Sequence, residues 1–191
     1  MHTDGSDGET PGLPDAVPTL ERAPVRLRPW RHDDAGLVLA VADDPLIPLV
    51  TTVPRDGRSA SAAAYVERQH RRLEEGTGFS FVVADLETDR PMGSIGLWTG
   101  EIAWGRASTG YWMGPQFRRR GHLTAALGLL TEWALGLPAI ERLDLRVEPW
   151  NEGSWRAAEA VGYEREGLLR SWERVGDERV DVYVYSILAR P

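Results

Sequence analysis

The sequence predicts an α/β (α+β) fold in which about four helices flank a twisted, mixed and mostly antiparallel sheet of six to seven strands. The first indication is a pair of β-rich segments at residues 79–86 and 92–98. Because only the short segment 87–91 separates them, they predict a hairpin. The second indication is the alternation of helical and strand-like segments after residue 121, which is typical of strand–helix–strand crossovers.

The other elements of the first half follow from strand and helix signals. They are a strand at 25–29, helices at 33–42 and 61–75, and a long strand at 102–113. Pro45 follows the first helix and Gly76 the second, and both residue types disfavour continuation of a helix.

The clearest helical period in the chain begins after Gly121. Apolar residues recur along one helix face until Pro138, and they are Leu123, Leu127, Leu130, Ala134 and Leu137. We expect this helix to pack on the sheet. Four further elements are predicted after it: a strand at 141–147, a helix at 154–161, a turn into a strand at 163–166 and a closing strand at 180–188.

The composition is that of one compact domain. The chain has 191 residues, of which 42% are hydrophobic and 27% charged, and it can bury its own core. The absence of cysteine excludes disulfides, thiolate metal sites and cysteine acyl-enzyme chemistry. No apolar run approaches the roughly 18–20 residues of a membrane helix, and the N-terminus lacks a signal-peptide pattern. We therefore expect a cytoplasmic protein without a membrane partner.

Residues 1–24 differ from the rest of the chain. They contain three Gly, four Pro and few large apolar side chains. They also contain five acidic residues and one Arg, and so contribute much of the net charge of -7 of the chain. Such a segment buries too little surface to offset the entropy lost on ordering. The sequence therefore predicts a flexible acidic tail at 1–24 and a single folded domain over 25–191.

Chemistry-bearing residues are concentrated at 114–124, where a predicted strand ends and the long helix begins. The first turn of a helix leaves backbone N–H groups without intrahelical partners, and three consecutive arginines stand beside it. Such a site suits a phosphate or pyrophosphate, although a solvated loop explains the arginines equally well. The lysine of a P-loop and the glycines of a dinucleotide-binding turn are both missing.

This segment resembles a motif of the GCN5-related N-acetyltransferase (GNAT) superfamily, RimJ/RimL-type branch, in which R-G-x-G-x-A leads from a strand into a helix. The matching positions are Arg118, Arg119, Arg120, Gly121, His122 and Leu123. Arg119 replaces the first glycine and Leu123 replaces the small residue. The loop therefore has a bulkier and more basic rim than the family pattern.

Further motifs of the same family follow at matching spacing. Asn151 and Ser154 fit an N-x-x-S at the head of a helix, and residues 162–167 fit a G-[FY]-x-x-E-G. Glu173 and Asp181 fit an acidic turn and an aspartate that enters the last strand. The resemblance covers almost the whole predicted domain.

The resemblance implies an acyl-CoA-dependent N-acyltransferase, most often an N-acetyltransferase, that uses acetyl-CoA or another acyl-CoA such as succinyl-CoA and no metal. The acceptor would be a primary amine, either a protein N-terminal α-amine or a small-molecule amine, that attacks directly in a ternary complex. The residues expected against the co-substrate are Trp112, Met113, Arg118, Arg119, Arg120, Gly121, His122, Leu123, Thr124 and Asn151. Pyrophosphate would bind backbone N–H groups of 119–124, and pantetheine would lie between two strands that splay near residues 113 and 147. Backbone groups near Trp112 and Met113 would polarise the thioester carbonyl.

The resemblance assigns proton transfer to two side chains. Ser154 would protonate the leaving thiolate, and Glu173 would accept the amine proton, directly or through water. Ser154 could instead cap its helix, and Glu173 could be a solvated turn carboxylate. An α-amine with a pKa of about 7.7–8.0 needs a weaker base than a lysine amine at about 10.4, which favours the less basic acceptor.

Two other functions compete with catalysis. The first is a CoA-binding regulatory or non-catalytic module of the same fold, which the departures at Arg119 and Leu123 would favour. The second is a nucleic-acid-binding domain that uses residues 118–120, and the net charge of -7 disfavours it. Tryptophans such as Trp98 and Trp172 are candidates for an aromatic acceptor pocket, although at least half of the tryptophans are expected in the core. Family members are often dimers, so the resemblance leaves a homodimer open.

Overall fold

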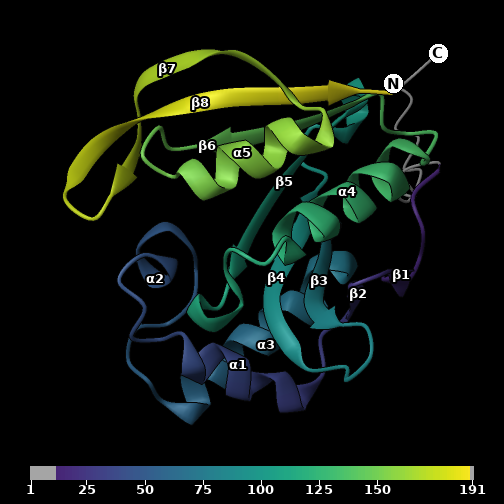
Figure 1. Cartoon of the computed structure of the whole chain (residues 1–191). Coiled ribbons are helices and arrows are strands. Elements are labelled where there is room, and N and C mark those ends of the chain that lie inside the picture. Colours follow the sequence, from purple (N-terminus) through teal and green to yellow (C-terminus); the bar gives the residue numbers. More distant parts are fainter. Residues whose placement is uncertain (1–11, 190–191) are drawn as a thin grey trace, which may run out of the picture.

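The computed structural model describes residues 12–189 and confirms the α/β class (Figure 1). The eight strands of these residues form one sheet in the order β1-β2-β3-β4-β5-β6-β8-β7, and all neighbours are antiparallel except β5 and β6. The strands are β1 (Leu20–Arg22), β2 (Val25–Pro29), β3 (Gly78–Asp85), β4 (Pro91–Trp98), β5 (Arg106–Met113), β6 (Arg142–Val147), β7 (Glu164–Val175) and β8 (Glu178–Leu188). The α-helices are α1 (Ala35–Ala40), α2 (Ile47–Val50), α3 (Ser59–Glu74), α4 (His122–Leu135) and α5 (Glu152–Val161).

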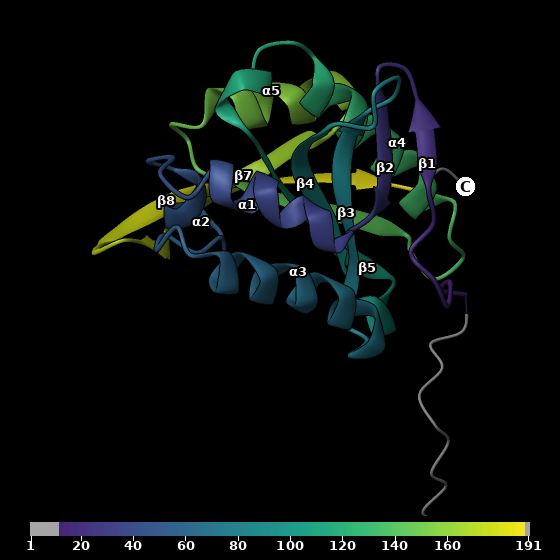
Figure 2. The same cartoon turned by 90° about the horizontal axis from the view of Figure 1, so that it is seen from below.

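Helices cover both faces of the sheet (Figure 2). Phe81 of β3 belongs to one buried cluster together with Leu127 and Leu130 of α4. The next residue of β3, Val82, belongs to a second buried cluster with Tyr65 of α3. Successive side chains of a strand point to opposite faces, so β3, which is buried on both faces, can serve both clusters.

Two elements correct the sequence prediction. β1 lies in the segment predicted as a flexible tail, where it pairs with β2, and Leu13, Val17 and Leu20 pack against the core. The tail prediction is therefore wrong for residues 12–24, because these few apolar side chains reach the core in spite of the surrounding prolines. The rest of that prediction, residues 1–11, lies outside the described residues. The second unpredicted element is the short helix α2, and with it the described residues contain eight strands and five α-helices.

The long strand predicted at 102–113 is shorter in the structure. Residues 102–104 form a 3-10 turn that ends at Gly105, whose φ of 67° lies in the left-handed region. β5 begins only at Arg106. The turn interrupts the strand because this backbone conformation, which favours glycine, redirects the chain.

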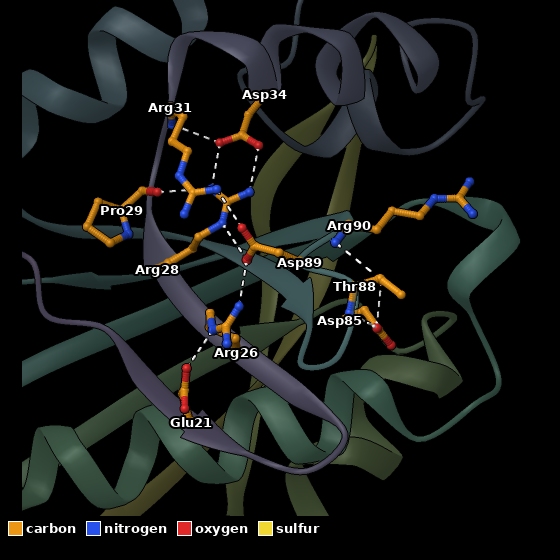
Figure 3. A network of polar contacts seen from close by, with 10 residues as sticks. All are labelled: Glu21, Arg26, Arg28, Pro29, Arg31, Asp34, Asp85, Thr88, Asp89 and Arg90. Atoms are coloured by element: carbon orange, nitrogen blue, oxygen red, sulfur yellow. Dashed lines mark hydrogen bonds and ion pairs between the residues drawn. The ribbon is translucent and has the colours of Figure 1, made fainter.

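Arginines and carboxylates join β2 to the first helical segment (Figure 3). Arg28 and Asp34 are both buried and form a bidentate ion pair, with Nη1–Oδ2 at 2.8 Å and Nη2–Oδ1 at 2.9 Å. Arg28 Nε also donates to Asp89 Oδ1 at 3.1 Å in the turn between β3 and β4, where Arg26 and Arg31 bind the same carboxylate. The network joins β2, the segment that carries Asp34 and the turn between β3 and β4. Removal of either partner of the buried pair would leave an uncompensated buried charge and would therefore destabilise the fold.

Asp89 predicts a loss of stability in acid. Burial alone would raise the pKa of Asp89, but hydrogen bonds from Arg31 and Arg26 and the charge of Arg28 outweigh burial and lower the pKa to about 2. The carboxylate therefore stabilises the fold above its unfolded pKa of about 3.9, and this contribution is lost as the pH falls toward 2. We expect the free energy of unfolding of Asp89→Asn, measured by urea denaturation, to fall less between about pH 4 and pH 2 than that of the wild type.

Asp177→Asn is the matched control for this measurement. Asp177 is exposed, and its carboxylate forms no ion pair with any residue between 12 and 189. The pH dependence of its unfolding free energy should equal that of the wild type. An unchanged acid slope in Asp89→Asn would contradict the lowered pKa.

Candidate active site

The two parallel strands of the sheet separate partway along their length. β5 keeps its pairing with β4 as far as Met113. Its pairing with β6 ends at the Thr109–Leu145 pair, the last that the described residues form. Beyond this pair the sheet is open between β5 and β6, as the resemblance implied.

The opening presents backbone groups of β5 to a ligand. The Gly114 N–H donates to the Met92 carbonyl of β4, and in an antiparallel pair such bonds recur at every second residue. The backbone groups of Tyr111 and Met113 therefore face the opening, whereas those of Trp112 face β4. Of the two residues expected to offer backbone groups here, Met113 is placed to do so and Trp112 is not.

A cavity of about 500 Å³ lies at the opening. Its lining comes from the end of α2 and the residues after it, from α3, from β4, β5 and β6, from the start of α5 and from β7. Trp112, Asn151, Ser154 and Glu173 all line it. Both side chains expected to transfer protons thus reach one cavity, together with two of those expected at the co-substrate. Met113 and residues 118–124 lie outside its lining.

Ser154 is the third residue of α5 and is 8% exposed. Its Oγ donates to Tyr111 Oη at 3.0 Å, and Tyr111 Oη donates back to the Ser154 carbonyl at 3.2 Å. Burial raises the pKa of the Tyr111 phenol, so this hydroxyl stays protonated. The helix cap is Asn151, which forms no side-chain capping bond. The Ser154 hydroxyl is therefore held by Tyr111 and does not cap the helix.

Glu173 reaches the cavity through a bulge in β7. The pairing of β7 with β8 shifts register between Leu169 and Glu173, and Ser171 adopts a left-handed φ of 52°. The Ser171 N–H donates to Asp181 Oδ1 at 2.7 Å, so the aspartate of the family motif holds the bulge. Trp172 and Glu173 both line the cavity beside it. Glu173 is exposed, so its solvated interpretation also remains open.

Arg118 has two partners within the protein. Its Nε donates to the Met113 carbonyl at 2.9 Å, and its Nη2 donates to Asp44 Oδ2 at 2.9 Å. Asp44 is buried, and its other oxygen accepts the N–H groups of Leu46 and Ile47 at the start of α2. Burial opposes ionisation of Asp44, but these N–H groups and Arg118 outweigh burial and lower its pKa. Arg118 therefore joins the end of β5 to the segment that carries α2.

The loop before α4 keeps the geometry of an anion-binding site. Arg119 and Gly121 have φ angles of 60° and 79°, in the left-handed region where the family pattern places glycine. Gly121 is the cap of α4 and lacks a side-chain capping bond, so the first-turn N–H groups are free of such a partner. The remaining expected residues differ in exposure: Arg119 and Arg120 are exposed, His122 and Thr124 are half-buried, and Leu123 packs against the core.

Sequence reasoning missed the partners that hold these residues. Tyr111 is separated from Ser154 by 43 residues and Asp44 from Arg118 by 74. Only the alternation along the strand, which puts Tyr111 on the opposite face from Trp112, gave a signal for the first pair. No local pattern marks Asp44.

The sheet opens between β5 and β6, and the N-terminus of α4 has free backbone N–H groups. The resemblance implied this architecture for an acyltransferase. Residues 25–164 match the family model described as an acetyltransferase (GNAT) domain. The chain therefore belongs to the GNAT acetyltransferase family, whose members are enzymes that use an acyl-CoA co-substrate.

Known relatives agree with this family. An uncharacterised N-acetyltransferase, p20 of Bacillus licheniformis, is 26% identical over 90% of this chain and 97% of its own. Mycobacterium smegmatis RimJ, solved with a CoA-disulfide, has a TM-score of 0.79 at 24% identity and covers 92% of this chain and 90% of its own. The microcin C7 self-immunity acetyltransferase MccE, solved with acetyl-CoA and AMP, has a TM-score of 0.76 at 18% identity and covers 87% and 93%. These structural likenesses show a shared fold.

Between residues 12 and 189 no helix combines the length and apolar character needed to cross a membrane. Over the same residues, no group of three or more His, Cys, Asp or Glu side chains is arranged to hold a metal ion.

Arg118 and Asp44 predict a non-additive pair of variants. Arg118→Met and Asp44→Asn should each weaken CoA binding about tenfold, because each removes the link that positions the loop before α4. The double variant should be no weaker than either single variant. Calorimetric titration with CoA measures all four affinities. If Arg118 instead bound the phosphates directly, Asp44→Asn would free the guanidinium and leave CoA affinity unchanged or improved.

Proposed function

We propose that the protein is an acetyl-CoA-dependent N-acetyltransferase that acts on a primary amine, either a protein N-terminal α-amine or a small-molecule amine. The observation that carries this proposal is the single cavity at the opening between β5 and β6, which Ser154 and Glu173 both line. A proton donor and a proton acceptor in one cavity are what amine acylation requires.

The residues present fit an acyl-CoA. Pantetheine carries amides, and the backbone groups of Tyr111 and the N–H of Met113 face the opening without partners from β6. The Met113 carbonyl already accepts a hydrogen bond from Arg118 Nε. Thr109 Oγ1 is buried, lies in the cavity lining and has no hydrogen-bond partner among residues 12–189, which suits a polar ligand beside it. The free N–H groups at the start of α4 would hold the pyrophosphate.

The chain would divide the proton transfers between two side chains. Acyl-CoA supplies a thioester, so the acceptor nitrogen gains the acyl carbon as the carbon–sulfur bond breaks and the thiol leaves. Glu173 would take the proton from the amine, directly or through water, and Ser154 would give a proton to the departing sulfur. For this step the Ser154 hydroxyl would turn its hydrogen from Tyr111 Oη to the sulfur, and Tyr111 Oη, 3.0 Å away, would turn its own hydrogen from the Ser154 carbonyl to Ser154 Oγ and keep that oxygen in place. The Met113 N–H would polarise the thioester carbonyl.

The departures from the family pattern do not favour the non-catalytic alternative. Arg119 occupies the left-handed conformation that glycine would supply, so the loop keeps its shape. Leu123, the second residue of α4, packs against the core and does not enter the cavity lining.

The proposal is tested by binding and then by turnover. Thermal shift and calorimetry with acetyl-CoA, succinyl-CoA and CoA should show one acyl-CoA that binds, since ligand at 100 times its Kd adds about 2.7 kcal/mol of stability. Release of free thiol in the presence of a panel of primary amines should then identify acceptors. Binding without transfer to any amine would support the non-catalytic module, and no binding would remove both functions.

Ser154→Ala should lower kcat about 100-fold, the lower end of what a positioned proton donor contributes. The Kd for acetyl-CoA should remain within twofold of the wild-type value, because the hydroxyl is proposed to act on the leaving sulfur. Stopped-flow thiol release and calorimetry give the two quantities. Ser59→Ala, at the exposed start of α3, is the control and should leave both unchanged. Wild-type turnover in Ser154→Ala would remove the proposed acid.

Glu173→Gln should lower kcat at neutral pH and recover part of the loss as the pH rises. An α-amine loses its proton at about pH 8, so Glu173 becomes less necessary as a base above that pH. Glu178→Gln is the matched control, because Glu178 is an exposed glutamate on the same β7–β8 hairpin. Identical pH–rate profiles for the two variants would show that Glu173 is a solvated carboxylate.

A further inference from the structure

An indole ring covers a pair of glycines in the cavity wall. Gly96 of β4 faces Gly110 of β5 in the sheet register. A Cβ on Gly96 would lie 2.3 Å from Trp98 Cη2, and one on Gly110 would lie 3.4 Å from Trp98 Nε1. The Trp98 ring therefore occupies the space that larger side chains would fill, and it lines the cavity level with the start of the opening.

Arg72 of α3 stacks on this ring. Its guanidinium carbon lies 4.3 Å from the centroid of the Trp98 ring, a cation–π contact. Its Nε donates to Gln69 Oε1 at 3.0 Å, and that oxygen also accepts the Ser80 hydroxyl at 3.0 Å. Trp30 Nε1 completes the chain by donating to Ser80 Oγ at 3.1 Å. The guanidinium is thus held on one face and one edge by groups that are fixed in the fold.

The opposite edge of the guanidinium has no partner in the part of the chain that the structure describes. Neither terminal nitrogen of Arg72 forms a hydrogen bond or an ion pair within residues 12–189, and both belong to a side chain that lines the cavity. Arg28, Arg118 and Arg142, by contrast, each bind a carboxylate. A half-buried, oriented guanidinium with two free parallel N–H groups matches the geometry of a planar carboxylate.

We infer that Arg72, supported on Trp98, binds a carboxylate of the acceptor, so that the acceptor is a small amine that also carries a carboxylate. The inference rests on the proposed acetyltransferase function and names its substrate class. The charges of the cavity agree with it, because Arg72 and Arg146 line the cavity together with Glu148 and Glu173, so an acceptor with both charges meets both signs. Arg72 is the arginine that Trp98 and Gln69 hold in place, whereas Arg146 is exposed and stacks on Trp172.

The spacing along β5 limits the size of the acceptor. The Arg72 and Trp98 pair stands over Gly110, one residue before Tyr111 and three before Met113. A strand rises about 3.3 Å per residue, so the carboxylate site lies roughly 3 to 10 Å along the strand from the backbone groups at the opening. A chain of a few carbon atoms spans such a distance between carboxylate and amine.

The test compares ω-amino acids that have one to five methylene groups with their amides. In the wild type, thiol release should show kcat/KM for the best acid about 10- to 100-fold above that for its amide, the range expected for a hydrogen-bonded charge. Arg72→Met should reduce the acid to the level of the amide and leave kcat/KM for the amide and the Kd for acetyl-CoA unchanged. Arg72→Lys, which keeps the charge but loses the planar fork, should fall between them.

Two further variants separate the site from general damage. Arg71→Met removes the exposed neighbouring arginine, which pairs with Glu75, and should behave as the wild type. Gly96→Ala displaces the Trp98 ring without touching Arg72 and should lower the preference for acid over amide.

The outcomes distinguish this inference from the proposed function. Transfer to amines with equal use of acids and amides, or an equal loss for both in Arg72→Met, would overturn the carboxylate site and leave the acetyltransferase intact. Absence of transfer to every amine would overturn the proposed function. The carboxylate site would then be judged by calorimetry with the N-acetylated acids, whose binding Arg72→Met should weaken. Phosphoethanolamine and short peptides with an acidic second residue, run beside the ω-amino acids, should be poorer acceptors, and a preference for either would overturn the small carboxylate-bearing acceptor.

Discussion

The separation of β5 from β6 beyond the Thr109–Leu145 pair is the constraint on which the site depends. It is imposed from both sides, because β5 stays paired with β4 as far as Met113 while β6 stays paired with β8 as far as the end of the strand at Val147. Each strand follows the twist of its own half of the sheet. The backbone groups between them lose their partners, and a ligand can take the place of the missing ladder.

The side chains around the opening connect its walls. The hydroxyls of Tyr111 and Ser154 hold β5 against the start of α5, while Asp181 fixes the bulge that brings Glu173 to the rim. Arg118 spans the loop before α4 and the segment of α2, and residues just after α2 line the cavity. Arg118 thus connects the loop before α4, proposed to bind the co-substrate, to the acceptor side of the cavity. Changes at either side are therefore expected to reach the other through a packed and hydrogen-bonded contact.

The sequence predicted what local patterns encode. The helical period after Gly121 and the β3–β4 hairpin depend on nearby parts of the chain, and the structure bears out the elements that they predicted. Glu173, by contrast, was expected in an acidic turn and lies inside β7, which extends beyond the predicted strand at 163–166 as far as Val175. The sequence did not predict β1, because Leu13, Val17 and Leu20 are separated by prolines and polar residues and show neither a helical nor a strand-like periodicity. The partners of Ser154 and Arg118 are separated from them by many tens of residues and emerge only once the sheet order is known. Trp98 stood out in the sequence as an aromatic residue, but nothing there indicated that it carries Arg72.

The placement of Arg72 would make the cavity selective among amines. A protonated amine without an acid group would bring another cation to a cavity that already holds Arg72 and Arg146, and it would gain only contacts with Glu148 and Glu173. An amine with a carboxylate at the right distance supplies each charge with its opposite, since the guanidinium, fixed by Trp98 and Gln69, needs no reorganisation to accept it. Burial lowers the pKa of Arg72, because a charge that is partly removed from water is disfavoured. A bound carboxylate would remove that cost, so the same contact that orients the acceptor would also stabilise the wall of the cavity.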